Sequence, residues 1–147
     1  MWSAGSGIDH VSLKLKAIYG DSIEVSIFDI SEDCISANRR AFEEDGLQAD
    51  FEVGDLFKAS YFGEFDVVFN TGLLEHFQIE DHQVLLRIFS DSLRPGGQYA
   101  TYVPYAGGRL YNHCMERMKA SGVWEFGPET PIATFRDLQS GECLSFF

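Results

Sequence analysis

Two glycines and an aspartate in this sequence fall where predicted strands end. Gly5 and Gly7 belong to a glycine-rich turn over residues 3–10, and Asp29 closes the apolar run IEVSIF. Glycine at a strand-to-helix turn lets a ligand approach backbone amides. Asp29 lies 20 positions after Asp9 (29 − 9), the place of a third glycine. An acid about 20 residues after such a turn is typical of sites that bind the hydroxyls of a nucleotide ribose.

Two further polar residues stand at the ends of predicted strands. Asp55 follows Gly54 after a short strand at 49–53, and Asn70 closes an apolar strand at 64–70 that we predict to be fully buried. Because the carboxyl ends of parallel strands meet at one edge of a sheet, we expect both residues to lie near Asp29.

The elements that position these residues alternate between strand and helix. Ser31 is the predicted N-cap of a helix over 31–45, with acids in its first turn. Other predicted helices carry the apolar stripes Val11/Leu15/Ile18, Val84/Leu85/Ile88/Phe89 and Leu110/Tyr111/Cys114/Met115/Met118, and other strands cover 23–29 and 98–103. This pattern predicts an α/β fold of the Rossmann-like, doubly wound type, a mostly parallel sheet with helices on both faces.

Composition narrows the functional classes. The 147 residues are 45 % hydrophobic, which suits one folded domain, and the net charge of −12 argues against nucleic acid or anionic membranes as partners. No apolar run approaches the ~18 residues of a membrane span, and no signal-peptide pattern precedes the first motif. The three cysteines form no CxxC, so we predict no metal site from them and interpret Cys34 and Cys114 as small core residues. We expect a cytoplasmic protein with a small-molecule substrate, and the oligomeric state stays open.

Five motifs in order resemble one family. SAGSGIDHVSLKLK, FDISEDCISANRRAFEEDGL, GDLF, FDVVFNTGLLEHF and LRPGG look like the class I S-adenosylmethionine-dependent methyltransferases, in the group of small methyltransferase domains. The resemblance covers about residues 3–104. It implies a single domain over 1–147, with a cofactor-binding core at 1–104 and a less regular substrate-side tail at 105–147.

The resemblance implies a role for each matching residue of the core. Gly5 and Gly7 would face the methionine part of S-adenosylmethionine. Asp29 would accept hydrogen bonds from the ribose hydroxyls, and Ile30 would pack on the adenine.

The later motifs match further positions of the family. Asp55 would accept from the adenine amino group, and Leu56 would offer its backbone amide to the ring. Asn70 would line the methionine end through its backbone. Glu75 and His76 lie in the loop where the family's substrate meets the methyl group, and His76 is the histidine placed to act as a base. We interpret His10, His82 and His113 as surface residues.

The chain departs from the family pattern at two positions. The family usually has an acid where Ser3 stands and a third glycine where Asp9 stands. Asp9 either binds the cofactor's amino group in place of the missing acid or crowds its carboxylate, and the sequence leaves both readings open. The expected first strand and the final strands are incomplete, so we expect a chain truncated at both ends.

Three functions compete. The first is transfer of a methyl group from S-adenosylmethionine to a small-molecule acceptor. The second is a non-catalytic, degenerate module that keeps the fold and serves as a partner surface. The third, a nicotinamide-dependent oxidoreductase, fits less well, because its fingerprint needs glycine where His10 stands.

Overall fold

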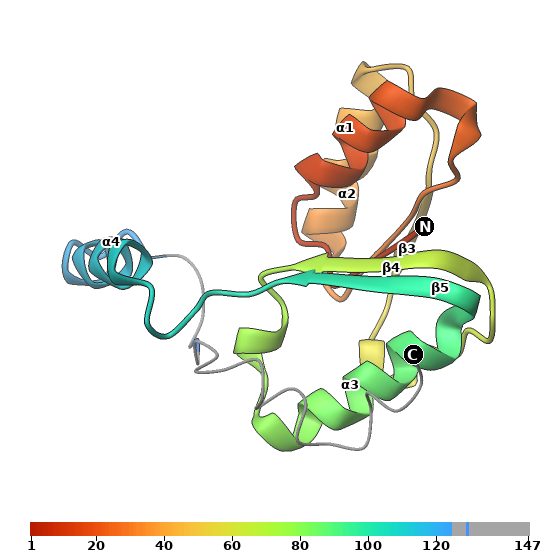
Figure 1. Cartoon of the computed structure of the whole chain (residues 1–147). Coiled ribbons are helices and arrows are strands. Elements are labelled where there is room, and N and C mark those ends of the chain that lie inside the picture. Colours follow the sequence, from red (N-terminus) through yellow and green to blue (C-terminus); the bar gives the residue numbers. More distant parts are fainter. Residues whose placement is uncertain (125–128, 130–147) are drawn as a thin grey trace. The chain divides into compact units, whose positions relative to one another are not determined.

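A computed structural model describes residues 1–124 and 129 of the chain (Figure 1). Within these residues one five-stranded sheet has the order β3-β2-β1-β4-β5. The strands are β1 (Trp2–Ala4), β2 (Ser26–Asp29), β3 (Asp50–Val53), β4 (Phe65–Thr71) and β5 (Leu93–Tyr102).

The sheet is parallel, and its strand order reverses at β1. Ala4 of β1 pairs in register with Phe28 of β2, and Ser3 pairs with Phe69 of β4. β2 pairs with β3 up to Asp29, which lies opposite Val53. The α/β architecture predicted from the sequence is therefore confirmed. In such a sheet the switch point between the first and fourth strands is where ligands bind.

Three helices lie between strands in the chain: α1 (His10–Tyr19), α2 (Glu32–Glu44) and α3 (Ile79–Ser92). A fourth, α4 (Arg109–Ala120), follows β5, and there are short 3₁₀ turns η1 (Gly20–Ser22), η2 (Leu56–Lys58) and η3 (Leu74–His76). α2 begins where the sequence predicted, because the Ser31 hydroxyl accepts a hydrogen bond from the Cys34 amide at 3.3 Å.

Side chains that alternate along the strands build a core on each face of the sheet. Val25 and Ile27 pack with Ile35 and Phe42 of α2. On the other face, the fully buried ring of Trp2 lies in an aromatic cluster. The other rings come from β2, the β3–β4 connection, β4 and the last turn of α3. They are those of Phe28, Tyr61, Phe65 and Phe89. Burial of both faces is what a parallel sheet requires.

The chain divides into two compact units. The first comprises Met1–Thr71 and Ile88–Thr101, and so holds nearly all of the sheet; the second comprises Gly72–Arg87 and Tyr102–Phe147. The prediction of a single domain with a border at 104 is not tested by this division, but the second unit also takes in the loop after β4. The part of the predicted tail at 125–128 and 130–147 lies outside the described residues.

Several predicted core positions are wrong. On α1, Val11 and Ile18 are exposed, because the buried side of that helix carries Ser12 and Lys16, whose ammonium group donates to the Ile23 carbonyl at 2.8 Å. On α3, Leu85 and Phe89 are buried as predicted, whereas Val84 is exposed.

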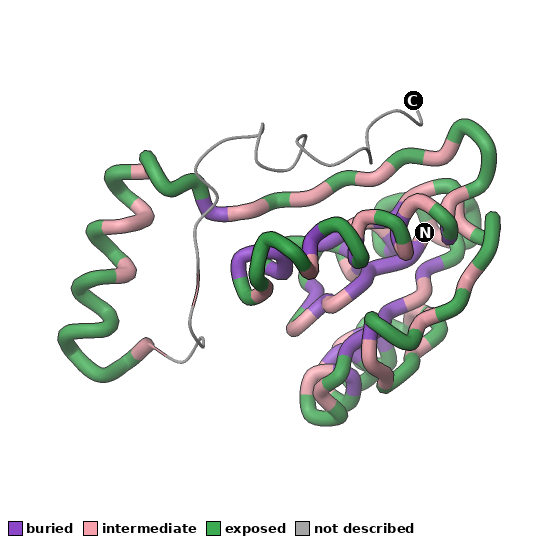
Figure 2. The backbone as a smooth tube through the Cα atoms, turned by 90° about the horizontal axis from the view of Figure 1, so that it is seen from below, coloured by how far each residue is buried: buried purple, intermediate pink, exposed green. Residues whose placement is uncertain are grey.

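α4 and the cysteines also differ from the predictions. No residue of α4 is buried against the described part of the chain, and the helix shows no buried segment in Figure 2. Cys114 on that helix is exposed and Cys34 only half-buried. The strand at β4 was predicted to be buried throughout, but only Val68 and Asn70 are. The physical reason is shared: an apolar stripe is buried only where another element covers it.

Candidate functional site

The glycine turn after β1 is fixed by backbone hydrogen bonds to the neighbouring strand. Gly5 and Gly7 have φ of 65° and 52°, a region that favours glycine. The amides of Gly5 and Ser6 both donate to the Phe28 carbonyl, at 2.8 and 3.1 Å. The turn is therefore held at the end of β2.

Asp29 joins that turn to the start of α2. Its side chain is buried, with 9 % exposed. Oδ2 accepts from the Gly7 amide and Oδ1 from the Ser31 amide, each at 2.8 Å. A carboxylate has about four lone-pair sites, so each oxygen retains one acceptor position. Asp29 can thus fix the turn and still accept from two hydroxyl groups.

Asn38 is a residue that sequence reasoning missed. It is buried on α2, and its amide nitrogen donates to the Gly7 carbonyl at 2.7 Å while its oxygen accepts from the Asp9 amide at 2.8 Å. An amide side chain on the otherwise apolar face of a helix was the available signal. Asn38 therefore holds Gly7 by its carbonyl, while Asp29 holds the same residue by its amide.

Asp9 is the N-cap of α1. Its Oδ1 accepts from the Val11 and Ser12 amides at 3.1 and 2.8 Å. Oδ2 is buried and has no hydrogen-bond partner among the described residues. The structure therefore gives Asp9 a capping role that explains an acid at the third-glycine position.

The end of β3 brings the next predicted residues to the same edge. The Gly54 amide donates to the Asp29 carbonyl at 2.9 Å, and a Cβ at Gly54 would stand 2.6 Å from the Phe28 ring. Asp55 follows, as the N-cap of η2: Oδ1 accepts from the Phe57 amide at 3.0 Å and Oδ2 pairs with Lys58 at 3.0 Å. The hydrogen bond from Lys58 lowers the pKa of Asp55.

The two hydrophobic residues predicted to hold the adenine lie beside these carboxylates in the chain. Ile30 is 73 % exposed and Leu56 is buried. The sequence prediction is compatible with both positions, and their contact with a cofactor stays a prediction.

Asn70 lies one residue beyond the paired Phe69, beside the end of β1. Its side chain is fully buried, donates to the Tyr99 hydroxyl at 2.9 Å and accepts from Thr101 at 2.6 Å. Burial raises the pKa of Tyr99. The side chain thus ties β4 to β5, which leaves the backbone of Asn70 as the part that can face a ligand.

Glu75 and His76 belong to the second unit, in η3. Glu75 is buried and His76 exposed, and burial raises the pKa of the Glu75 carboxyl. His82, predicted to be a surface residue, is buried: its Nε2 lies 2.7 Å from the Leu74 carbonyl, because α3 returns alongside η3.

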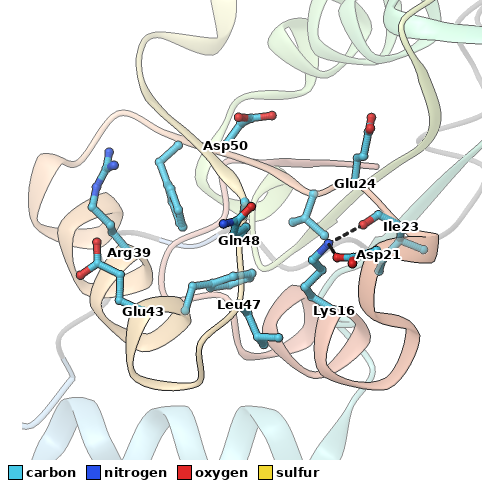
Figure 3. A pocket seen from close by; sticks show the side chains of 13 residues that line it. Lys16, Asp21, Ile23, Glu24, Arg39, Glu43, Leu47, Gln48 and Asp50 are labelled. Atoms are coloured by element: carbon cyan, nitrogen blue, oxygen red, sulfur yellow. Dashed lines mark hydrogen bonds and ion pairs between the residues drawn. The ribbon is translucent and has the colours of Figure 1, made fainter.

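A cavity of about 550 Å³ lies in the first unit, away from the residues above. It is lined by residues that precede β2 or begin β3, among them Glu24 and Asp50, and by Lys16 and Arg39 from the two helices (Figure 3). These positions are at the amino ends of the strands, whereas Asp29 is at a carboxyl end. The cavity is therefore separate from the candidate nucleotide site.

The comparisons with known proteins agree with this geometry. A sequence family described as a methyltransferase domain matches residues 3–97, which include the glycine turn, Asp29, Asp55 and Asn70. The chain belongs to this family. No protein in the curated collection matches the chain in sequence.

Solved structures show the same fold. One, described in a study of the conversion of a disulfide bond into a thioacetal group during echinomycin biosynthesis, has a TM-score of 0.77 and 22 % identity, over 94 % of this chain and 58 % of its own. The S-adenosylmethionine-dependent methyltransferase SibL, in its apo form, has a TM-score of 0.70 and 22 % identity, over 95 % and 41 %. The PH0226 protein of Pyrococcus horikoshii has a TM-score of 0.68 and 23 % identity, over 82 % and 52 %. This chain therefore spans about half the length of these structures.

None of the helices in the described part of the chain is both long enough and apolar enough to cross a bilayer.

Proposed function

We propose that this chain binds S-adenosylmethionine and takes part in the transfer of its methyl group to a small-molecule acceptor. The observation that carries the proposal is the Asp29 carboxylate, which holds the glycine turn through Gly7 and keeps one acceptor position on each oxygen for the two ribose hydroxyls. Family membership over residues 3–97 and a SAM-dependent methyltransferase among the similar structures support the choice of cofactor.

The remaining cofactor contacts are proposed from the positions of the residues along this edge. The methionine part lies over Gly5 and Gly7 and the backbone of Asn70. The adenine packs on Ile30, its amino group donates to Asp55, and the Leu56 amide donates to the ring. All seven residues, including Asp29, belong to the first unit.

Methyl transfer requires few catalytic groups from the protein. When bound, S-adenosylmethionine would supply the methyl group: its carbon–sulfur bond would break with the electron pair going to sulfur, while a nucleophile of the acceptor bonds to the methyl carbon and loses a proton. Alignment of the two reactants and exclusion of water supply most of the acceleration. We assign Glu75 and His76 to the acceptor side of the reaction, with His76 as the candidate base for an alcohol or amine. The net charge of −12 favours a small acceptor over a nucleic acid.

Calorimetric titration of the full chain with S-adenosylmethionine and with S-adenosylhomocysteine tests the proposal. We expect saturable heat with one ligand per chain, weakened at least tenfold in Asp29→Ala and unchanged in the exposed control Asp50→Ala. Heat with NADH but with neither sulfur compound would support the oxidoreductase instead. No heat with any of the three would support the non-catalytic module.

For the acceptor side, His76→Gln should lower turnover and leave cofactor affinity unchanged. The matched control is His113→Gln on the exposed face of α4. Turnover equal to that of the unmodified chain would remove His76 from the reaction.

A further inference from the structure

Three side chains that can ligate a metal come together in the second unit. Glu75 and His76 are neighbours in η3, and Glu129 comes from more than 50 positions along the chain (129 − 75 = 54). One ligand atom from each lies within 4.8 Å of the other two. Around a tetrahedral ion with ligand distances of about 2.1 Å, ligand atoms are separated by about 3.4 Å. Rotation of the side chains can bring the ligand atoms from within 4.8 Å of one another to about this separation.

Glu75, the buried member of the group, has a carboxylate oxygen without a hydrogen-bond partner in the described part of the chain. Glu75 is 4 % exposed, and its Oε2 has no hydrogen-bond partner among the described residues. A buried polar atom without a partner is rare, and a bound ion is one of its recognised explanations. The second carboxylate nearby, Glu129, adds like charge, which a cation would neutralise.

A neighbouring side chain orients the second carboxylate. The Tyr111 hydroxyl of α4 donates to Glu129 Oε2 at 2.5 Å. Ligating carboxylates are commonly held by such outer hydrogen bonds, which fix the oxygen that faces the metal. The group therefore has a ligand set and an outer support, which distinguishes it from a chance cluster of exposed acids.

We propose that Glu75, His76 and Glu129 bind a divalent transition-metal ion of the zinc type. Two carboxylates and one imidazole suit Zn²⁺ and its neighbours in the first transition row. Three protein ligands leave a coordination position for an oxygen or nitrogen donor of a bound small molecule, as in metal sites that act on substrates. All three ligands belong to the second unit, whereas the seven residues proposed to bind S-adenosylmethionine belong to the first, so metal binding can be measured in the absence of the cofactor.

The ion changes the role proposed for His76. An imidazole nitrogen whose lone pair binds a metal cannot accept a proton at the same atom. Metal binding and action as a base at that nitrogen therefore exclude each other, and the measurement of bound metal decides between them.

The test uses the untagged full chain, stripped with a chelator and then desalted. Zn²⁺ is titrated calorimetrically, and Co²⁺ is followed by its visible absorption, which reports ligand number and geometry. We expect one ion per chain. Glu75→Gln, His76→Gln and Glu129→Gln should each weaken binding by more than the roughly 10–100-fold that outer-ligand changes cost, and Tyr111→Phe by about that amount.

Matched controls are Glu80→Gln and Glu116→Gln, exposed acids of the same unit, and His113→Gln. These should bind the ion as the unmodified chain does. Glu75→Gln keeps the shape of the side chain and removes a buried charge, so its circular dichroism should show a folded protein. Absence of a bound ion, or equal affinity in the site variants and the controls, would overturn the proposal. Cofactor titration of the metal-free chain tests the proposed function separately.

Discussion

The replacement Asp29→Asn tests the geometry of the glycine turn more directly than any other change. Asn has the size and shape of Asp, but one of its two terminal atoms is an NH₂ group. Both Asp29 oxygens accept backbone N–H bonds at 2.8 Å, from Gly7 and Ser31. Whichever way the Asn amide turns, its NH₂ group faces one of these donors. One hydrogen bond is therefore replaced by a contact between two donors.

The expected cost follows from the kind of bond and its surroundings. A hydrogen bond to a charged group contributes about 1.5–3 kcal/mol, and a neutral one about 0.5–1.5 kcal/mol. Both bonds of Asp29 are only partly buried, so the lower ends of these ranges apply. Loss of one bond and weakening of the other together lower the free energy of unfolding by about 2–3 kcal/mol, a large share of the about 5–15 kcal/mol of an ordinary domain.

Urea unfolding of the cofactor-free chain, followed by far-ultraviolet circular dichroism, measures this change. The midpoint should fall with an unchanged slope, because the surface exposed on unfolding is the same. Asp50→Asn, on the exposed side of the edge strand β3, is the matched control and should stay within about 0.5 kcal/mol of the unmodified chain.

The result that would contradict the reasoning is an Asp29→Asn chain as stable as the unmodified one. In that case the two hydrogen bonds do not hold the turn. Reduced cofactor affinity in such a chain would then show that Asp29 acts on the ligand alone.

Three other changes test neighbouring parts of the first unit. Asp9→Ser keeps an oxygen that caps α1 and removes the buried Oδ2, so we expect stability equal to or above that of the unmodified chain. Asp9→Ala removes the cap and should lose about 1 kcal/mol of stability. Equal melting temperatures for the two variants would disprove the capping role. Asn70→Ala leaves the Tyr99 and Thr101 hydroxyls without their partner and should lower the free energy of unfolding in urea by about 2–4 kcal/mol. A smaller decrease than that of Tyr99→Phe would contradict the hydrogen-bond network. Trp2→Ala opens a cavity in the aromatic cluster and should cost about 3–5 kcal/mol, so a chain that still melts cooperatively near the original temperature would show that the cluster is not the core.

The sequence was sufficient for the features that depend on residues close together in the chain. The N-cap at Ser31 and the end of β2 at Asp29 are set by hydrogen bonds within a few positions and by the alternation of apolar side chains. The positive φ angles of Gly5 and Gly7 likewise follow from a tight turn that only glycine adopts easily. The order of these elements was enough to predict a parallel sheet and the edge that carries Asp29.

The burial of individual side chains depends instead on which elements of the fold pack against each helix face. The stripe with Val11 and Ile18 has perfect helical spacing, yet it faces away from the sheet because Lys16 and Ser12 occupy the covered side. His82 was predicted to be a surface residue, but it is buried because η3 packs beside it. Periodicity shows that a helix has two faces, but not which face another element covers.

The sequence by itself determined the elements, the glycine turn and the acid beside it, because local geometry and local hydrogen bonds select them. Only the tertiary structure decided that Asn38 clamps Gly7 from 31 positions away, and that Glu129 lies beside Glu75 and His76. Such contacts join segments that are distant in the chain. Their formation depends on how the whole chain packs, and no spacing in the sequence encodes that.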